Sequence, residues 1–233
     1  MLHFSAFDLV ALAWFVGAWI GYVIALETTA YGRTGLNALV NSYRDRWMQQ
    51  LLTREMRMVD GQVTASLQNG TAFFASTSLI AVGGTLTLFR STDDLLQLVA
   101  QLPLGIVTTR LQWEAKLLGL VVIFVYAFFK FAWSYRLFNY VAIMIGAAPP
   151  VAESDTPAAR EFVHRASALC RDAGRHFNRG QRAFFFALGY LGWFIGPAVL
   201  IAATTGVVIV MWRRQFASES RHAFLDAGAG SRG

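Results

Sequence analysis

Four polar side chains lie within a strongly apolar stretch, residues 124–150, and they are the groups in this chain best placed to do chemistry. Lys130, Ser134, Arg136 and Asn139 are surrounded there by aromatic and aliphatic residues. Charged groups inside a membrane are costly, so they turn toward a partner, an anion or water. The four residues therefore indicate a ligand or lipid-headgroup site, or else cations that anchor a helix at the membrane surface.

Few carboxylates are available to compensate these cations. Glu27 ends the first apolar segment, and Asp60 and Glu161 lie in the connectors between apolar segments. Opposite charges that share a low-dielectric site attract strongly. We predict that Glu27 pairs with Lys130 or Arg136.

The composition determines which elements must position these residues. The 233-residue chain is 55% hydrophobic and 15% charged, which is typical of a membrane protein. A helix needs about 20 apolar residues to cross a hydrocarbon core of about 30 Å. We predict an all-α, integral membrane four-helix bundle that forms a single membrane domain over 1–220, with spans at about 7–26, 71–89, 117–145 and 183–212. Pro197 is expected to kink the fourth span.

The two long connectors have the pattern of amphipathic interfacial helices, at about 43–63 and 158–177. In the second connector the apolar residues Phe162, Ala166, Cys170, Ala173 and Phe177 share one helical face, and Arg160, His164, Arg171 and Arg175 share the opposite one. Such helices lie in the membrane surface with their cations toward lipid phosphates. Arg171 and Arg175 are therefore candidate ligands of anionic headgroups.

The distribution of charge predicts an orientation. The two long connectors hold eleven of the twenty Lys and Arg residues, and the formal net charge is +6. By the positive-inside rule both connectors face the cytoplasm and both termini lie outside, although Arg213 and Arg214 would also suit the inner leaflet. We expect a multi-pass protein of the bacterial inner (plasma) membrane with a disordered tail over 221–233. Because the basic residues have this role in topology, we expect no nucleic-acid partner.

The sequence gives little support to enzymatic chemistry. It contains no phosphate-binding loop, zinc-protease motif or serine-hydrolase elbow, and its single cysteine, Cys170, has no neighbouring thiol to share a metal. His164 and His176 are twelve residues apart, about 18 Å along a helix, too far to bind one metal ion. We expect no catalytic residue, metal or cofactor.

Three stretches carry a resemblance to a known family: "LQNGTAFFASTSLIAVGG" at 67–84, "FKFAWSYRLFNYVAIMIGAAP" at 129–149 and "RHFNRGQRAFFFALGYLGWFIGP" at 175–197. The chain resembles the uncharacterised multi-pass membrane protein family known as domain of unknown function 599, over almost its whole length. The resemblance implies a four-helix membrane protein and no assigned activity. Because Asn178 and Arg182 lie inside the third stretch, they join the candidate site residues.

Three functions remain open. The first is a non-enzymatic membrane module that binds anionic lipid headgroups or a partner protein. The alternative is a small transporter or channel, a possible homo-oligomer, with an anion path near Lys130 and Arg136. A membrane-embedded enzyme is the third reading, and it has the least support because the deep segments offer only hydroxyls and these two cations.

Overall fold

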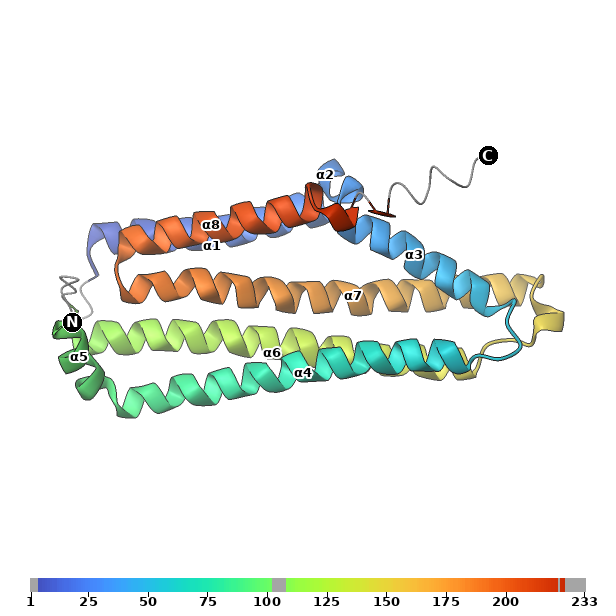
Figure 1. Cartoon of the computed structure of the whole chain (residues 1–233), viewed down its shortest axis with the longest axis horizontal. Helices are drawn as coiled ribbons and strands as arrows, with labels where there is room; N and C mark the ends of the chain where they lie inside the picture. The colour runs from blue at the N-terminus through green and yellow to red at the C-terminus, as the bar shows by residue number, and fades with distance from the viewer. Residues whose placement is uncertain (1–3, 102–107, 222, 225–233) are drawn as a thin grey trace. The chain divides into compact units, whose positions relative to one another are not determined.

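The computed structural model describes residues 4–101, 108–221 and 223–224, and the described part is helical with no strand. The elements are α1 (Ala6–Glu27), α2 (Ala30–Thr34), α3 (Leu36–Leu51), α4 (Met58–Arg90), α5 (Thr92–Ala100), α6 (Arg110–Gly146), η1 (Val151–Glu153), α7 (Pro157–Leu191), η2 (Gly192–Phe194) and α8 (Pro197–Phe216) (Figure 1). Residues 225–233, where the sequence predicted a disordered tail, lie outside the described residues, as does residue 222.

The chain folds into two compact units. Unit 1 comprises residues 1–36, 78–126 and 182–233, and unit 2 comprises residues 37–77 and 127–181. The long helices α4, α6 and α7 each contribute residues to both units.

Four described helices are long and apolar enough to cross a membrane, as the sequence predicted. They are Ala6–Glu27, Met58–Arg90, Arg110–Gly146 and Pro197–Arg221. The length and composition of these helices indicate an integral membrane protein. At about 1.5 Å per residue, the 33 residues of α4 and the 37 of α6 are longer than the hydrocarbon core requires.

The fourth predicted span, 183–212, is not one helix. Its residues form the end of α7, the short η2 turn and α8, so the chain reverses direction within this segment. Pro197 occupies the first turn of α8, where its missing N–H leaves no hydrogen bond unmade, so it starts a helix rather than kinking one. The reversal is tight because a Cβ on Gly192 would lie 2.9 Å from the Val199 carbonyl oxygen.

The predicted interfacial helices also have different boundaries. Residues 43–63 span a break, because α3 ends at Leu51 and α4 begins at Met58. Asp60 holds this break together, since its Oδ1 accepts hydrogen bonds from Trp47 Nε1 (2.7 Å) and Arg54 NH1 (2.6 Å). Residues 158–177 are the first part of α7, which continues through Gly174 and Gly180 to Leu191.

In unit 1, α1 and α8 lie side by side and run parallel (Figure 1). Asp8 accepts a hydrogen bond from Trp193 Nε1, just before α8, and Trp14 donates to Thr205 Oγ1. Tyr22 packs on Trp212 near the ends of both helices. The start of α1 and the end of α8 therefore lie at opposite ends of this unit. The expectation that both termini lie on one side of the membrane stays a prediction.

Unit 2 is organised around a compact apolar cluster that includes Met48, Phe138, Val141, Cys170 and Ala173. Met48 comes from α3, Phe138 and Val141 from α6, and Cys170 and Ala173 from α7, and all five are at most 2% exposed. The cluster fixes α3 against α7, which is the pair of helices that carries the candidate site described next.

Candidate anion-binding site

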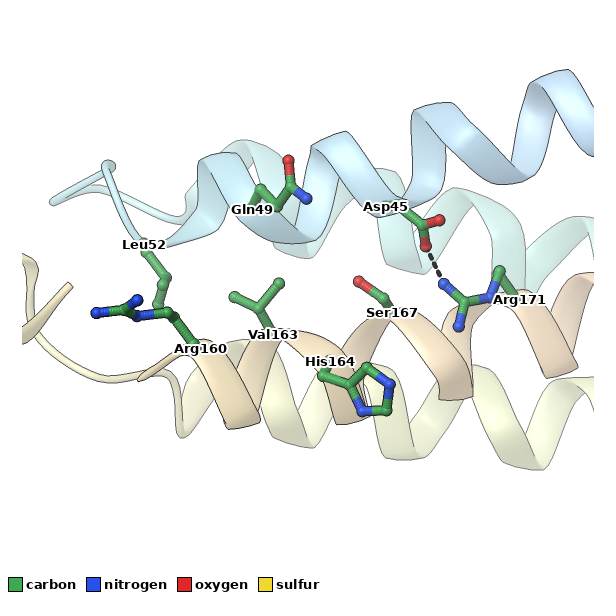
Figure 2. A pocket seen from close by; sticks show the side chains of 8 residues that line it. All are labelled: Asp45, Gln49, Leu52, Arg160, Val163, His164, Ser167 and Arg171. Carbon is green, nitrogen blue, oxygen red and sulfur yellow. Dashed lines mark hydrogen bonds and ion pairs between the residues drawn. The ribbon is translucent and has the colours of Figure 1, made fainter. Parts of the chain in front are cut away.

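A polar pocket of about 420 Å³ lies between α3 and α7 in unit 2 (Figure 2). Its lining residues are Asp45, Gln49 and Leu52 from α3 and Arg160, Val163, His164, Ser167 and Arg171 from α7. Such a volume falls in the range of about 300–1,000 Å³ that is typical of small-molecule sites. The pocket is therefore large enough for a lipid headgroup.

Helical periodicity explains why these residues meet. Residues spaced by three, four or seven positions share one face of a helix. Arg160, His164, Ser167 and Arg171 follow this spacing on α7, and Asp45, Gln49 and Leu52 follow it on α3. Two polar stripes consequently face each other above the apolar cluster of unit 2.

Ser167 is the most buried polar side chain in the pocket. It is 5% exposed. Figure 2 shows the side chain pointing from α7 toward α3, into the space between the helices. A hydroxyl in this position can donate a hydrogen bond to a ligand oxygen in the pocket.

The charges at the pocket leave positive charge available to a ligand. Arg171 NH1 is paired with Asp45 Oδ1, whereas Arg160 NH2 donates to the backbone carbonyl oxygen of Asp155 at 2.9 Å. Two guanidinium groups therefore face one carboxylate among the lining residues. Guanidinium groups form strong charge-assisted hydrogen bonds to phosphate, so this balance favours an anionic ligand.

Next to the pocket, Arg44 and Cys170 lie in a poorly solvated environment. Burial lowers the pKa of the Arg44 guanidinium, whose NH1 donates to Asn41 Oδ1 at 2.7 Å. Burial also raises the pKa of the Cys170 thiol to about 11, against the opposing effect of the nearby Arg44 charge. The Cys170 side chain is fully buried, so it serves packing and not reactivity.

The predicted site residues on α6 are held by other protein groups. The Ser134 hydroxyl donates to the carbonyl oxygen of Ala173 at 2.8 Å, and Asn139 Oδ1 accepts from Gln68 Nε2 at 2.6 Å. Arg136 Nε donates to Tyr140 Oη at 2.6 Å. Lys130 also has an interaction within the protein. The bonds of Ser134 and Asn139 tie α6 to α7 and α4, whereas the Arg136 bond lies within α6.

Glu27 belongs to unit 1, where its Oε1 accepts from Arg182 NH1 at 2.9 Å. Arg182 is 8% exposed and Glu27 18%, so this pair links the end of α1 to α7 in a largely buried position. The sequence identified both residues as candidates without pairing them. The predicted pairing of Glu27 with Lys130 or Arg136 stays a prediction.

The other candidates on α7 fall outside the pocket, except for one. Arg171 lines it, while Arg175 pairs with Asp172 one turn away and Asn178 lies half-buried further along the helix. The sequence reasoning missed Asp45 and Ser167. Their spacing relative to Gln49 and Arg171 was the available signal, although it did not reveal that the two stripes face each other.

The described residues contain no group of three His, Cys, Asp or Glu side chains that could hold a metal ion.

Comparison with known proteins shows the family, because the model of one family matches residues 10–220. The chain belongs to the family described as Protein of unknown function, DUF599. No curated protein and no solved structure matches it. The DUF599 match spans both units and all of α3 and α7, so the pocket lies within the family region.

Proposed function

We propose that this DUF599 protein is a non-enzymatic, multi-pass membrane module that binds the phosphate of an anionic lipid headgroup in the pocket between α3 and α7. The observation that carries the proposal is the pocket itself, a space of about 420 Å³ that is lined by Arg160, Arg171 and the buried Ser167. Arginine, serine and histidine side chains are the donors that recognise phosphate oxygens.

The hydropathy of the surrounding helices supports a position at the membrane surface. Neither α3 nor α7 is among the four helices that are apolar enough to span a membrane. Cationic helices of this kind lie at the level of the lipid headgroups, where each Lys or Arg near an anionic surface contributes about 1 kcal/mol. Ser134 and Asn139 on α6 already bond to protein groups, so we favour the α3–α7 pocket over an anion path near Lys130 and Arg136.

The proposed setting is the bacterial inner membrane, with both arginine-rich connectors in the cytoplasm. In this proposal the start of α1 lies outside and Arg213 and Arg214, near the end of α8, lie inside, which is supported by the parallel arrangement of α1 and α8. The pocket is formed by these two connectors, so in this proposal it faces the cytoplasm, where the inner leaflet is anionic.

Native mass spectrometry of the protein extracted with its own lipids tests the proposal. We expect bound anionic phospholipid on the wild type and about tenfold less retention for Arg171→Gln, because loss of one charge-assisted contact costs about 1.4 kcal/mol. Arg165→Gln is the matched control, since Arg165 lies on the same helix, is 70% exposed and pairs with Glu161 outside the pocket. Equal lipid retention by the wild type and both variants would overturn the proposal.

A further inference from the structure

Trp133, Arg136 and Tyr140 form a stacked group on α6, which we call the arginine clamp. Their spacing of three and four residues places the side chains on one face of the helix. The guanidinium carbon of Arg136 lies 5.7 Å from the centre of the Trp133 ring and 5.6 Å from the centre of the Tyr140 ring. Its Nε also donates to Tyr140 Oη at 2.6 Å. Two aromatic rings and one hydrogen bond therefore hold the cation in place.

The arginine clamp is exposed, so it can meet an anion from outside the protein. Trp133 is 47% exposed and Tyr140 is 38% exposed, and Arg136 is exposed as well. The bond to Tyr140 occupies Nε, so the guanidinium still offers NH1 and NH2, and the phenol hydroxyl still offers its own hydrogen. Guanidinium and hydroxyl donors that lie this close together suit the oxygens of one phosphate group.

The part of α6 before the arginine clamp has the length and the surface of a membrane span. A hydrocarbon core of about 30 Å needs about 20 helical residues, which residues 110–129 provide. Leu118, Val122 and Phe129 are each more than half exposed in this part, as is expected of apolar side chains that face lipid. Trp, Tyr and Arg are the residues that collect where a span meets the headgroups, and the clamp follows this part directly.

The part of α6 after the arginine clamp is covered by protein instead. Phe138, Val141 and Ile145 are at most 4% exposed, and they belong to the apolar cluster of unit 2 that α3 and α7 complete. Packing within unit 2 therefore accounts for the apolar character of this part, and lipid contact is not needed to explain it.

We infer that Arg136 binds the phosphate of a bilayer lipid between Trp133 and Tyr140, and that the membrane surface crosses α6 at this level. Residues 110–129 then cross the hydrocarbon core, and the end of α6 extends beyond the headgroups. This contact lies on an exposed face of α6, so it does not depend on the α3–α7 pocket.

The register of α6 against α7 brings Arg171 to the same level. Phe131 packs on Phe177, and the Ser134 hydroxyl donates to the Ala173 carbonyl oxygen at 2.8 Å, so the two helices run antiparallel. Arg171 and the arginine of the clamp each lie two residues beyond this hydrogen bond, in the same direction. The lipid that meets the clamp therefore belongs to the headgroup layer that the proposed function assigns to the pocket.

Spin labels at two exposed apolar positions of α6 test the membrane level. In a Cys170→Ala background, Val122→Cys and Ile143→Cys are labelled in full-length protein and reconstituted into vesicles of phosphatidylethanolamine and phosphatidylglycerol. The two positions are matched, because Val122 is 61% exposed and Ile143 is 67% exposed. We expect oxygen, which dissolves in lipid, to dominate relaxation of the label at 122, and a water-soluble nickel chelate to dominate at 143. The same dominant agent at both positions would overturn the inference.

Lipid affinity tests the contact of Arg136 with phosphate. Phosphatidylglycerol is titrated into delipidated protein that carries Arg171→Gln, which weakens the pocket, and binding is read by native mass spectrometry. Adding Arg136→Gln should lower the remaining affinity about tenfold, since one charge-assisted contact is lost, whereas adding Arg165→Gln should leave it unchanged. An equal affinity with and without Arg136→Gln would overturn the inference. Lipid binding that weakens in Arg171→Gln alone would in that case still support the proposed function.

Discussion

At the residue scale, Gly174 shows how closely α3 approaches α7. A Cβ on Gly174 would lie within 3.0 Å of three atoms of the Arg44 guanidinium. The absence of a side chain at Gly174 thus leaves room for a buried cation. The sequence offered no sign of this contact, because 130 positions separate the two residues.

A double-mutant cycle tests the Arg44 contact. Gly174→Ala should destabilise unit 2 by less than about 1 kcal/mol, because the guanidinium that its Cβ displaces is the end of a flexible side chain. In an Arg44→Ala background the same change should be neutral or stabilising, since alanine favours a helix by up to about 1 kcal/mol over glycine. Chemical unfolding in detergent of the wild type, Gly174→Ala, Arg44→Ala and the double variant gives the stability cost of Gly174→Ala in each background. An equal cost in both backgrounds would contradict the contact.

The pKa of Cys170 predicts an alkaline loss of stability. Folding raises the pKa of this thiol from 9.0 to about 11. Above pH 9 the unfolded chain therefore loses its thiol proton while the folded chain keeps it, so the free energy of unfolding falls between pH 9 and about pH 11. The loss is about 1.4 kcal/mol per pH unit in this window. It should disappear in Cys170→Ala when unfolding is compared at pH 8 and pH 10.5, and an identical pH dependence in both proteins would refute it.

The candidate site was predictable in part at this scale. Arg171 was identified as a headgroup ligand because the cations of α7 repeat at helical spacing. Ser167 and Asp45 were not identified, because a serine or aspartate on a polar face has no special signal until the opposing helix is placed. The hydrogen bonds of Ser134, Asn139 and Arg136 on α6 become visible only in the folded structure, so the candidate site on α6 stays a prediction.

At the element scale, the reversal between α7 and α8 was hidden from hydropathy. Residues on both sides of Gly192 are apolar, so the segment has the composition of a single span. Lys116 stabilises the reversal, because its Nζ donates a hydrogen bond to the Trp193 carbonyl oxygen at 2.8 Å. This donor comes from α6, and a local pattern could not identify it.

Two glycines at this reversal provide a matched pair of variants. Gly192→Ala should destabilise unit 1 by about 1–3 kcal/mol, because its Cβ would meet the backbone of Val199 and Leu200. Gly196→Ala should change stability by less than about 0.5 kcal/mol, since a Cβ there meets nothing within 4 Å and the backbone is extended. Thermal unfolding in detergent compares them, and similar losses for both variants would argue against the tight reversal.

At the scale of the whole molecule, the hydrophobic patterning correctly predicted an all-helical chain with four apolar helices. The hydrophobic pattern did not predict the direction of α8, because it did not reveal the reversal between α7 and α8. The parallel contacts of α1 with α8 therefore predict termini on opposite sides of the membrane.

Accessibility of introduced cysteines tests this topology. In a Cys170→Ala background, Ser5→Cys should react with an impermeant maleimide in intact cells. Ser218→Cys, just beyond α8, should react after permeabilisation and not before it. Labelling of both positions from the same side would contradict the predicted topology.

The central claim is that Arg171 contributes to an anionic-headgroup site, and its ion pair with Asp45 provides the most direct test. The pair is partly exposed, so its contribution to stability is small, about 0.2–1 kcal/mol. Asp45→Asn releases Arg171 and removes a negative charge from the pocket, whereas Arg171→Gln removes the ligand itself. The measurement is the affinity for anionic phospholipid by native mass spectrometry in these two variants and the wild type. We predict that Asp45→Asn binds the lipid more tightly and Arg171→Gln more weakly than the wild type, and a change in the same direction, or no change, in both variants would contradict the claim.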